Sequence, residues 1–444
     1  MLKRFAGDIL NKLIIVASLL FSLFLTQCRD FTALYQSGHN NNPLEKTAVL
    51  ATHYYSVPNG AWKDVIIYAH GYVDPTTPPP TIPDDQIDGR YIGDIINSLG
   101  YAFATTSYPD NGLVVRDAIP DVKKLADEFK AQFPQTERIF LIGVSEGGLI
   151  TTKVIEDYPE TFTGGIAGCG PIGNFEKQLD YFGNFQVLFH YFYPQIGLLN
   201  LGIGSPEHVP DTLIALWQDG TIKHEVETRI IDVSVPLLKT ADAPLSNPDD
   251  TRETLLGILR YNLLATNDAI QKLGGEPFDN SKIFYHGTGS GESDLLLNQH
   301  IPRFRADSTA IRNIDQYYQT TGKLQIPLVT IHNTGDPIVP YFHEPLYEQK
   351  IVRQGSSSLH VNIPVNSYGH CNFTTADLLG AFSALINMTS NKQLVVNQNI
   401  FPESKQVQEF LQIANRTGAH PTIIPPDQST KRELTTYKHG YLSH

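Results

Sequence analysis

Gly143-Val144-Ser145-Glu146-Gly147 decides the fold of this chain, because of the residues on either side of it. The apolar run 138–142 before it is rich in residues that favour strands, and residues 148–155 after it have a helical pattern. The pattern predicts a strand, a sharp turn and a helix, with the serine at the turn. Glycines two residues to either side give the strand and the helix room to pass. The hydroxyl is then expected at the carboxyl edge of a sheet, facing the first amides of the helix.

Further strands and helices alternate on both sides of this motif. Strand-like runs lie at 48–57, 64–69, 101–106, 326–332 and 359–365, and helix-like runs at 91–99, 121–133 and 376–386. Such alternation predicts an α/β fold, with a mostly parallel sheet flanked by helices.

The order of these runs predicts a core that is interrupted by an insertion. The expected parts are 1–28 (signal peptide), 29–50 (linker), 51–171 (first part of the core), 172–323 (inserted lid or cap), 324–390 (second part of the core) and 391–444 (C-terminal extension). The insertion is far longer than an ordinary connection, so we expect a large, mainly helical subdomain.

Four phenylalanines follow helical spacing within this insertion: Phe182, Phe185, Phe189 and Phe192. Other apolar residues surround them, so one interpretation is a helix buried in the core of the insertion. The other is a lid whose apolar face covers the serine and lines a substrate pocket.

Composition excludes some classes of partner. The net charge of −13 argues against nucleic acid, whose phosphates require a basic surface. The hydrophobic fraction of 41% and the aromatic fraction of 10% are those of an ordinary globular protein.

The first residues read as an export signal. Lys3 and Arg4 precede an apolar run from Leu13 to Leu25, which is too short to span a bilayer comfortably. Leu25-Thr26-Gln27-Cys28 resembles a bacterial lipobox, although Gln27 replaces the usual small residue. We therefore expect an exported protein, which is either anchored to the membrane through a lipid on Cys28 or secreted after ordinary cleavage.

Two cysteines remain beyond the signal. Cys169 ends a strand-like segment after the serine helix, and Cys371 follows a histidine near the proposed site. An oxidising compartment permits a disulfide, and the sequence leaves a bridge and two separate thiols equally open.

A serine hydroxyl needs a histidine base, which in turn needs a carboxylate to orient it. In chain order, Asp336 follows the strand-like run 326–332, and His370 follows the run 359–365. Both are expected just beyond the carboxyl ends of parallel strands, as Ser145 is. We predict that the three form a catalytic triad.

Each member also has a simpler interpretation. Asp336 lies in a Gly-Asp-Pro sequence that commonly forms a turn, and His370 has competitors in His332 and His360. Those two histidines lie within strand-like runs, where their rings would point into or off the sheet. Glu146, next to the serine, is expected to face away from the hydroxyl and to form an ion pair.

Acyl transfer also needs hydrogen-bond donors for the oxyanion. The backbone amide of Glu146 is one candidate, because it begins the helix after the serine. The loop that follows the strand-like run 64–69 contains His70-Gly71-Tyr72, and we assign the second donor to the amide of Tyr72.

Together, His70-Gly71-Tyr72, Gly143 to Gly147, Gly335 to Pro340 and Gly369-His370-Cys371 resemble the α/β-hydrolase superfamily. The resemblance covers the core and neither the insertion nor the tail. Within the superfamily the chain is most similar to secreted bacterial serine esterases and lipases. Tannase-type and feruloyl esterases carry cysteines just before the serine and just after the histidine. Here Cys371 matches the second, but Val144 occupies the first position.

The resemblance implies an enzyme that cleaves small-molecule or lipid-like carboxylic esters through an acyl-enzyme, without a cofactor. No His-Glu-x-x-His motif or other metal-ligand spacing is present, so no metal site is predicted. Two alternatives remain: a prolyl-oligopeptidase-like peptidase, and a catalytically silent binding protein of the cell envelope. The peptidase usually carries a β-propeller, and no repeat of 40–50 residues is visible here.

Overall fold

The computed structural model of the chain describes residues 50–76, 79–194, 215, 218, 248–390 and 393–425. The expected signal peptide with Cys28, almost all of the linker and the last part of the C-terminal extension lie outside these residues. No helix among the described residues has both the length and the apolar character needed to cross a membrane.

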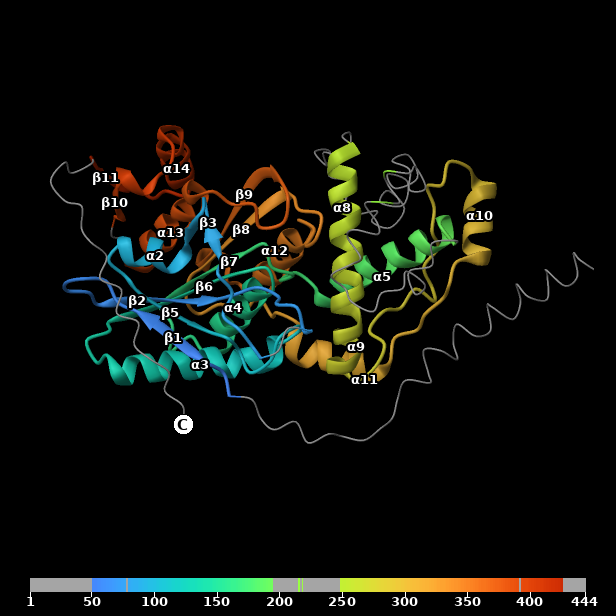
Figure 1. Cartoon of the computed structure of the whole chain (residues 1–444), viewed down its shortest axis with the longest axis horizontal. Coiled ribbons are helices and arrows are strands. Elements are labelled where there is room, and N and C mark those ends of the chain that lie inside the picture. The colour runs from blue at the N-terminus through green and yellow to red at the C-terminus, as the bar shows by residue number, and fades with distance from the viewer. Residues whose placement is uncertain are drawn as a thin grey trace, which may run out of the picture. The chain divides into compact units, whose positions relative to one another are not determined.

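A seven-stranded sheet forms the centre of the described chain. Its strands, in spatial order, are β1 (His53–Ser56), β5 (Ala102–Thr106), β2 (Asp64–Ala69), β6 (Arg138–Val144), β7 (Gly164–Gly168), β8 (Leu328–Gly335) and β9 (His360–Tyr368). Only the pairing of β1 with β5 is antiparallel. The predicted α/β class with a mostly parallel sheet is therefore confirmed (Figure 1).

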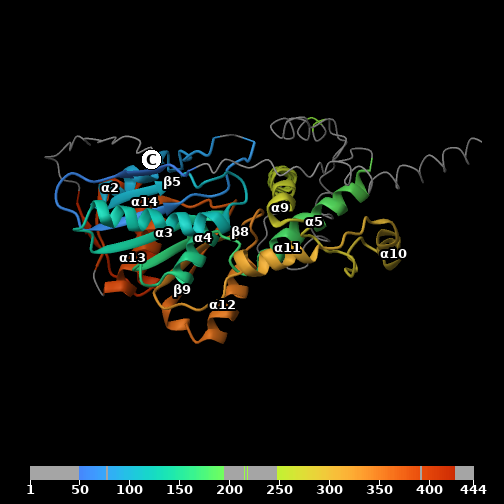
Figure 2. The ribbon, with the colours of Figure 1, turned by 90° about the horizontal axis from the view of Figure 1, so that it is seen from below.

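Helices cover both faces of the sheet because successive strand residues point to opposite sides. In β2, Val65 and Ile67 belong to one buried cluster, whereas Ile66 and Tyr68 belong to another. Helices α3 (Val115–Gln132) and α4 (Glu146–Asp157) pack in the first cluster. Helices α2 (Ile92–Ser98), α13 (Thr375–Ser390) and α14 (Ser404–Arg416) pack in the second. Figure 2 shows α3 and α4 side by side on one face.

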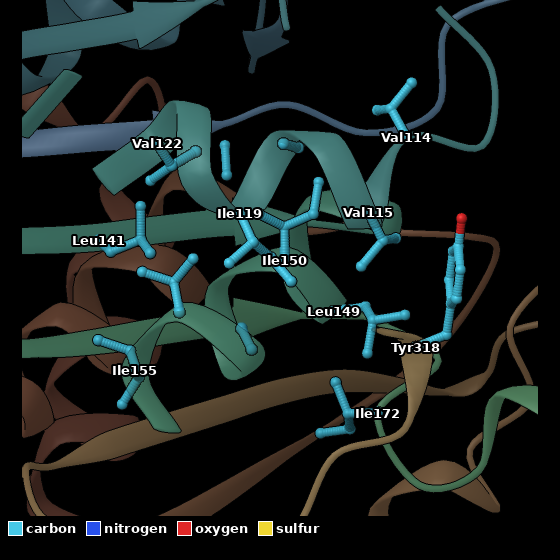
Figure 3. Packing of buried hydrophobic residues seen from close by; sticks show 14 of the residues in the cluster. Val114, Val115, Ile119, Val122, Leu141, Leu149, Ile150, Ile155, Ile172 and Tyr318 are labelled. Carbon is cyan, nitrogen blue, oxygen red and sulfur yellow. The ribbon is translucent and has the colours of Figure 1, made fainter. Parts of the chain in front are cut away.

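Apolar contacts between α3 and α4 position the helix that follows Ser145. Val115, Ile119 and Val122 of α3 belong to one buried cluster with Leu149, Ile150 and Ile155 of α4, and Ile119 lies beside Ile150 in it (Figure 3). Leu149, Ile150 and Ile155 are completely buried. Because this packing fixes α4 on the sheet, the turn at its first residue is also fixed.

The insertion contributes a separate helical cluster. Its described elements are α5 (Phe175–Phe192), α8 (Pro248–Tyr261), η2 (Asn262–Thr266), α9 (Asn267–Leu273), α10 (Gly291–His300), α11 (Ser308–Asn313) and η3 (Ile314–Tyr318). Helices α5, α8 and α10 share a hydrophobic cluster of their own with Ile338 and Val339. In contrast, Leu273, Ala310 and Ile314 pack in the cluster of the sheet, so the later part of the insertion is joined to the core.

The remaining elements are shorter or peripheral. They are β3 (Gln86–Ile87), β4 (Arg90–Tyr91), α12 (His343–Gln354), η4 (Ser357–Leu359), β10 (Val395–Asn397), η5 (Gln398–Ile400) and β11 (Thr422–Ile424). Helix α14, in the predicted C-terminal extension, packs on α13 through Phe410, Ile413 and Ala414. This part of the extension therefore completes one face of the core.

Candidate active site

Ser145 lies in the sharp turn that joins β6 to α4. Its φ of 56° and ψ of −124° are strained for a residue with a side chain. Glycines make this turn sterically possible: a Cβ at Gly147 would overlap the carbonyl oxygen of Ala69, and one at Gly143 would overlap that of Gly147. The turn presents the half-buried serine at the carboxyl end of its strand, as the sequence pattern predicts.

The structure brings the three predicted triad residues together. His370 Nε2 lies 2.8 Å from Ser145 Oγ, and His370 Nδ1 lies 2.7 Å from Asp336 Oδ2. The imidazole can accept the serine proton through Nε2 only while its Nδ1–H donates to the carboxylate. The geometry is therefore that of a serine activated by an oriented base.

Asp336 is buried and fixed by its own loop. Its Oδ1 accepts hydrogen bonds from the amides of Ile338 (2.8 Å) and Val339 (3.0 Å). Burial alone would raise the pKa of Asp336, but the neighbouring His370 and His332 outweigh burial and lower this pKa to about 2. The carboxylate is therefore ionised at neutral pH, as orientation of a histidine base requires.

The loops that carry Asp336 and His370 are tied to each other. A register shift in the pairing of β8 with β9 falls between Asn333 and Gly335, immediately before Asp336. The buried side chain of Asn333 donates to the carbonyl of Asn372 (3.0 Å) and accepts from its amide (3.0 Å). The sequence analysis did not identify Asn333, because an asparagine in a strand carries no signal of its distant partner.

Cys169 and Cys371, whose state the sequence left open, form a disulfide. The bridge joins the residue after β7 to the residue after His370. Both cysteines have positive φ, as Ser145 does, so three of the five such non-glycine residues in the described part of the chain lie at this site. Local strain is thus concentrated where the three loops meet.

Two predicted oxyanion donors lie in the expected elements. The amide of Glu146 is the first of α4, and the loop after β2 carries Tyr72. Within that loop, a Cβ at Gly71 would lie 3.2 Å from the Cβ of Ser145 and 3.8 Å from its Oγ. The backbone before Tyr72 therefore runs close to the nucleophile, as an oxyanion loop must.

The side chain of Glu146 differs from the expectation of an ion pair. It is buried, and its Oε1 accepts a hydrogen bond from the amide of Val114 at 2.8 Å. No ion pair of Glu146 is found among the described residues. Burial raises the pKa of Glu146 to about 8, so the carboxyl is mostly protonated at neutral pH. A buried carboxyl group that is neutral carries no charge, so it needs no counter-ion.

The four phenylalanines of the insertion have different surroundings. Phe185 and Phe189 are completely buried in the cluster of α5, α8 and α10, and Phe192 packs against it half-buried. Phe185 and Phe189 therefore belong to the core of the insertion, which was the first of the two interpretations. Phe182, on the same helix, is also buried, but its ring lies parallel to that of Tyr261 with 6.4 Å between centroids.

Tyr261 is an aromatic residue of the site that the sequence analysis did not single out. Its ring lies 6.4 Å from the imidazole of His370 and 6.0 Å from the ring of Tyr72, between centroids. It is the last residue of α8, and no local pattern distinguishes it from the other apolar residues of that helix. Tyr72, Phe182 and Tyr261 together form an aromatic wall that reaches the triad through Tyr261.

Helix α5 is attached directly to the loop of Asp336. Gln178 donates to the carbonyl of Ile338 (2.9 Å), and the hydroxyl of Tyr181 donates to that of Pro337 (2.7 Å). His343 Nε2 lies 3.0 Å from the side-chain oxygen of Gln178. The insertion therefore supports the triad and is more than a cover.

One group of potential metal ligands occurs among the described residues, formed by Cys169, His370 and Cys371. The two sulfur atoms are bonded to each other, so neither offers the thiolate that binds zinc. The disulfide form of the site therefore does not fit a metal.

Comparisons of the sequence with known proteins found a matching family model and a similar protein. A family model described as "Serine aminopeptidase, S33" matches residues 114–245. An o-phthalyl amidase from Xanthobacter agilis is 20% identical over 336 residues, which cover 60% of this chain and 71% of that protein.

Two solved structures illustrate the range of similar proteins. Feruloyl esterase B from Aspergillus oryzae is 13% identical, with a TM-score of 0.46 over 77% of this chain and 79% of that one. An acylaminoacyl peptidase from Pyrococcus horikoshii is 16% identical, with a TM-score of 0.33 over 72% of this chain. The match spans 35% of the length of that peptidase.

Proposed function

We propose that the chain is a serine hydrolase of the α/β-hydrolase superfamily and that it cleaves carboxylic esters through an acyl-enzyme. The observation that carries this proposal is the continuous set of contacts from Ser145 through His370 to Asp336. A scaffold that only binds a ligand has no need of a strained serine with a histidine and a buried carboxylate behind it.

The mechanism follows from the positions of these groups. His370 Nε2 removes the proton of Ser145 as Oγ attacks the ester carbonyl, and Asp336 holds the imidazolium that forms. The amides of Tyr72 and Glu146 stabilise the oxyanion, and His370 then gives its proton to the departing alcohol. Water attacks the acyl-enzyme in the same way, with His370 again as the base. Each oxyanion donor contributes about 2.7–4 kcal/mol to lowering the barrier.

The aromatic wall supports an ester with an apolar or planar group. The ring of Tyr261 lies beside His370, and the rings of Tyr72 and Phe182 lie against that of Tyr261. Such rings bind apolar surface and stack on aromatic groups. We therefore include an aromatic or otherwise apolar acyl or alcohol portion in the proposal.

Amide cleavage is the second candidate activity. It is favoured by the similarity to an amidase and to a family model described as a serine aminopeptidase. The same triad serves both reactions, because the attack and the acyl-enzyme are common to esters and amides.

Nitrophenyl esters of increasing acyl length, with benzoyl and cinnamoyl esters, should be compared with aminoacyl anilides. We expect kcat/KM to be highest for esters and to rise with apolar or aromatic acyl groups, and Ser145→Ala to remove all turnover. A preference for anilides would replace the esterase assignment by the amidase one. Absence of both activities in folded protein would favour a binding protein.

We also propose that the protein is exported, from the charged and apolar pattern of residues 1–28. Labelling of cells with radioactive palmitate, with Cys28→Ala as the control, distinguishes lipid anchoring from simple secretion.

A further inference from the structure

A second histidine, His332, lies beneath the triad and has acceptors at both ring nitrogens. It is completely buried in β8, with Nε2 2.7 Å from the carbonyl oxygen of Val339 and Nδ1 3.1 Å from Glu344 Oε1. A carbonyl oxygen and a carboxylate only accept hydrogen bonds, and a neutral imidazole has a single N–H. With Glu344 ionised, both contacts are satisfied together only when the ring carries two protons.

The other contacts of Glu344 agree with a charged pair. Its Oε2 accepts from the hydroxyl of Thr330 at 2.6 Å and from the side-chain amide of Asn362. Burial would lower the pKa of His332, but its contacts with Asp336 and Glu344 outweigh burial and raise this pKa to about 10. The pKa of Glu344 is lowered despite its burial, chiefly through His332. The pair is therefore an imidazolium and a carboxylate.

This pair reaches the triad through one oxygen atom. His332 Nε2 lies 3.6 Å from Asp336 Oδ2, and the same oxygen lies 2.7 Å from His370 Nδ1. His332 also bonds to Val339, whose amide donates to the other oxygen of Asp336. A single ring thus contacts both the carboxylate and the loop that orients it.

We propose that His332 is a protonated positioning residue of the triad: anchored by Glu344, it fixes the Asp336 loop and shares the negative charge of Asp336 with His370. The kinetic part of this inference rests on the proposed hydrolase function. Its statement about protonation does not.

Several groups other than Glu344 face the pair from the elements packed on it. The ring of Tyr341 lies 5.6 Å from that of His332, and His343 of α12 interacts electrostatically with it. His360 of β9 acts on Glu344 and lies 3.1 Å from the hydroxyl of Thr330. Burial lowers the pKa of both His343 and His360. Glu344 and Asp336 therefore dominate the charge around His332 near neutral pH.

Substitution of either partner changes the charge near Asp336 in opposite senses. His332→Gln removes a cation and leaves the negative charge of Glu344. Positive charge on His370 is then favoured, so the acid limb of the pH profile, where kcat/KM rises with pH, moves to higher pH. Glu344→Gln leaves the cation without its counter-ion, so the acid limb moves to lower pH. We expect each displacement to be about one pH unit, as for a charge within a few ångströms.

The experiment measures kcat/KM for a nitrophenyl ester against pH in four folded proteins: wild type, His332→Gln, Glu344→Gln and His53→Gln. His53 is a matched control, because it also lies between two carboxylates, Asp121 (3.1 Å) and Glu128 (2.7 Å), away from Asp336. We expect opposite displacements for the two test variants, with a fall in kcat of at least tenfold for His332→Gln, and no displacement for the control. Limbs that coincide in all four proteins, or that move in the same direction in both test variants, would overturn the proposal.

Nitrogen NMR of histidine-labelled protein tests protonation without any need for turnover. The His53→Gln protein is used beside the wild type, because burial would lower the pKa of His53 but Asp121 and Glu128 outweigh burial and raise this pKa as well. We expect one imidazole to keep protons on both nitrogens at pH 8 in His53→Gln as in the wild type. A spectrum in which every imidazole is neutral at that pH would overturn the inference, whatever the enzyme hydrolyses.

Discussion

The buried carboxyl group of Glu146 makes the stability of the folded protein depend on pH. Its neighbour on one side is Ser145. Its Oε1 accepts a hydrogen bond from the amide of Val114, while Oε2 lacks a hydrogen-bond partner among the described residues. Protonation removes the cost of a buried charge, which is why burial raises its pKa to about 8. The folded protein therefore holds this proton to higher pH than the unfolded chain does.

The direction of the stability change follows from this difference. Between pH 4.5 and about 8 the folded state binds more protons at Glu146 than the unfolded state, so the free energy of unfolding falls as pH rises. This fall in the free energy of unfolding is on the order of a few kcal/mol across the interval, and we expect Glu146→Gln to abolish it. Urea unfolding of both proteins at pH 5 and pH 8.5 measures it. An equal pH dependence in the two proteins would contradict the assignment.

Asp336 contributes in the opposite direction and in another window. Its pKa is lowered to about 2, so the stabilisation from this carboxylate is present above about pH 4 and is lost as pH falls toward 2. The windows of Asp336 and Glu146 barely overlap, so acid denaturation near pH 3 does not obscure the test of Glu146.

The disulfide joins two loops at the ends of β7 and β9. Its cysteines are 202 residues apart, so in the chain-entropy model the bridge stabilises the fold by about 5 kcal/mol at most. The double variant Cys169→Ala/Cys371→Ala should lower both Tm and kcat, because Cys371 immediately follows His370. Thermal unfolding and ester turnover, each with and without reductant, check this.

Reductant should change the wild type toward the behaviour of the double variant and leave that variant unchanged. A wild type whose Tm does not respond to complete reduction would show that the bridge is not a structural constraint.

Helices α5 and α8 each carry an aromatic residue, and we expect substitution of one to affect mainly stability and substitution of the other mainly catalysis. Phe185 is completely buried in the cluster of the insertion, so Phe185→Ala should cost about 3–5 kcal/mol in folding free energy. Its effect on kcat/KM, measured where the variant is folded, should be small. Tyr261 is half-buried beside His370, so Tyr261→Ala should lower kcat/KM for aromatic esters tenfold or more with a smaller loss of stability. Parallel effects on both quantities in both variants would contradict the distinction.

Strong local patterns made much of the core predictable. Residues 64–69 form β2 as expected, and the turn at Ser145 follows from two glycines that nothing larger can replace. Within the insertion, the π-helical turn η2 separates α8 from α9, and the sequence analysis predicted only that the insertion is mainly helical. Helix α12, which contains Pro345, was not predicted from the sequence. In the structure this proline lies in the first turn of α12, where its missing N–H is not needed.

The site was predictable where chain order and strand ends sufficed, as for the positions of Ser145, Asp336 and His370. Features that depend on side chains from distant elements were not. The Asn333–Asn372 contact, the ring of Tyr261 and the pair of His332 with Glu344 each join segments whose proximity no local pattern records. The expected ion pair of Glu146 failed for the same reason, since burial protonates the group instead.

The central claim is that Ser145 is the nucleophile of this molecule, activated by His370 and Asp336. Peptide mass mapping after reaction with a fluorophosphonate tests it most directly, in the wild type and in Ser145→Ala and His370→Gln. We predict one stoichiometric adduct on Ser145 in the wild type, none in Ser145→Ala and labelling at least a thousandfold slower in His370→Gln. An adduct on another residue, or folded wild type that stays unmodified, would contradict the account.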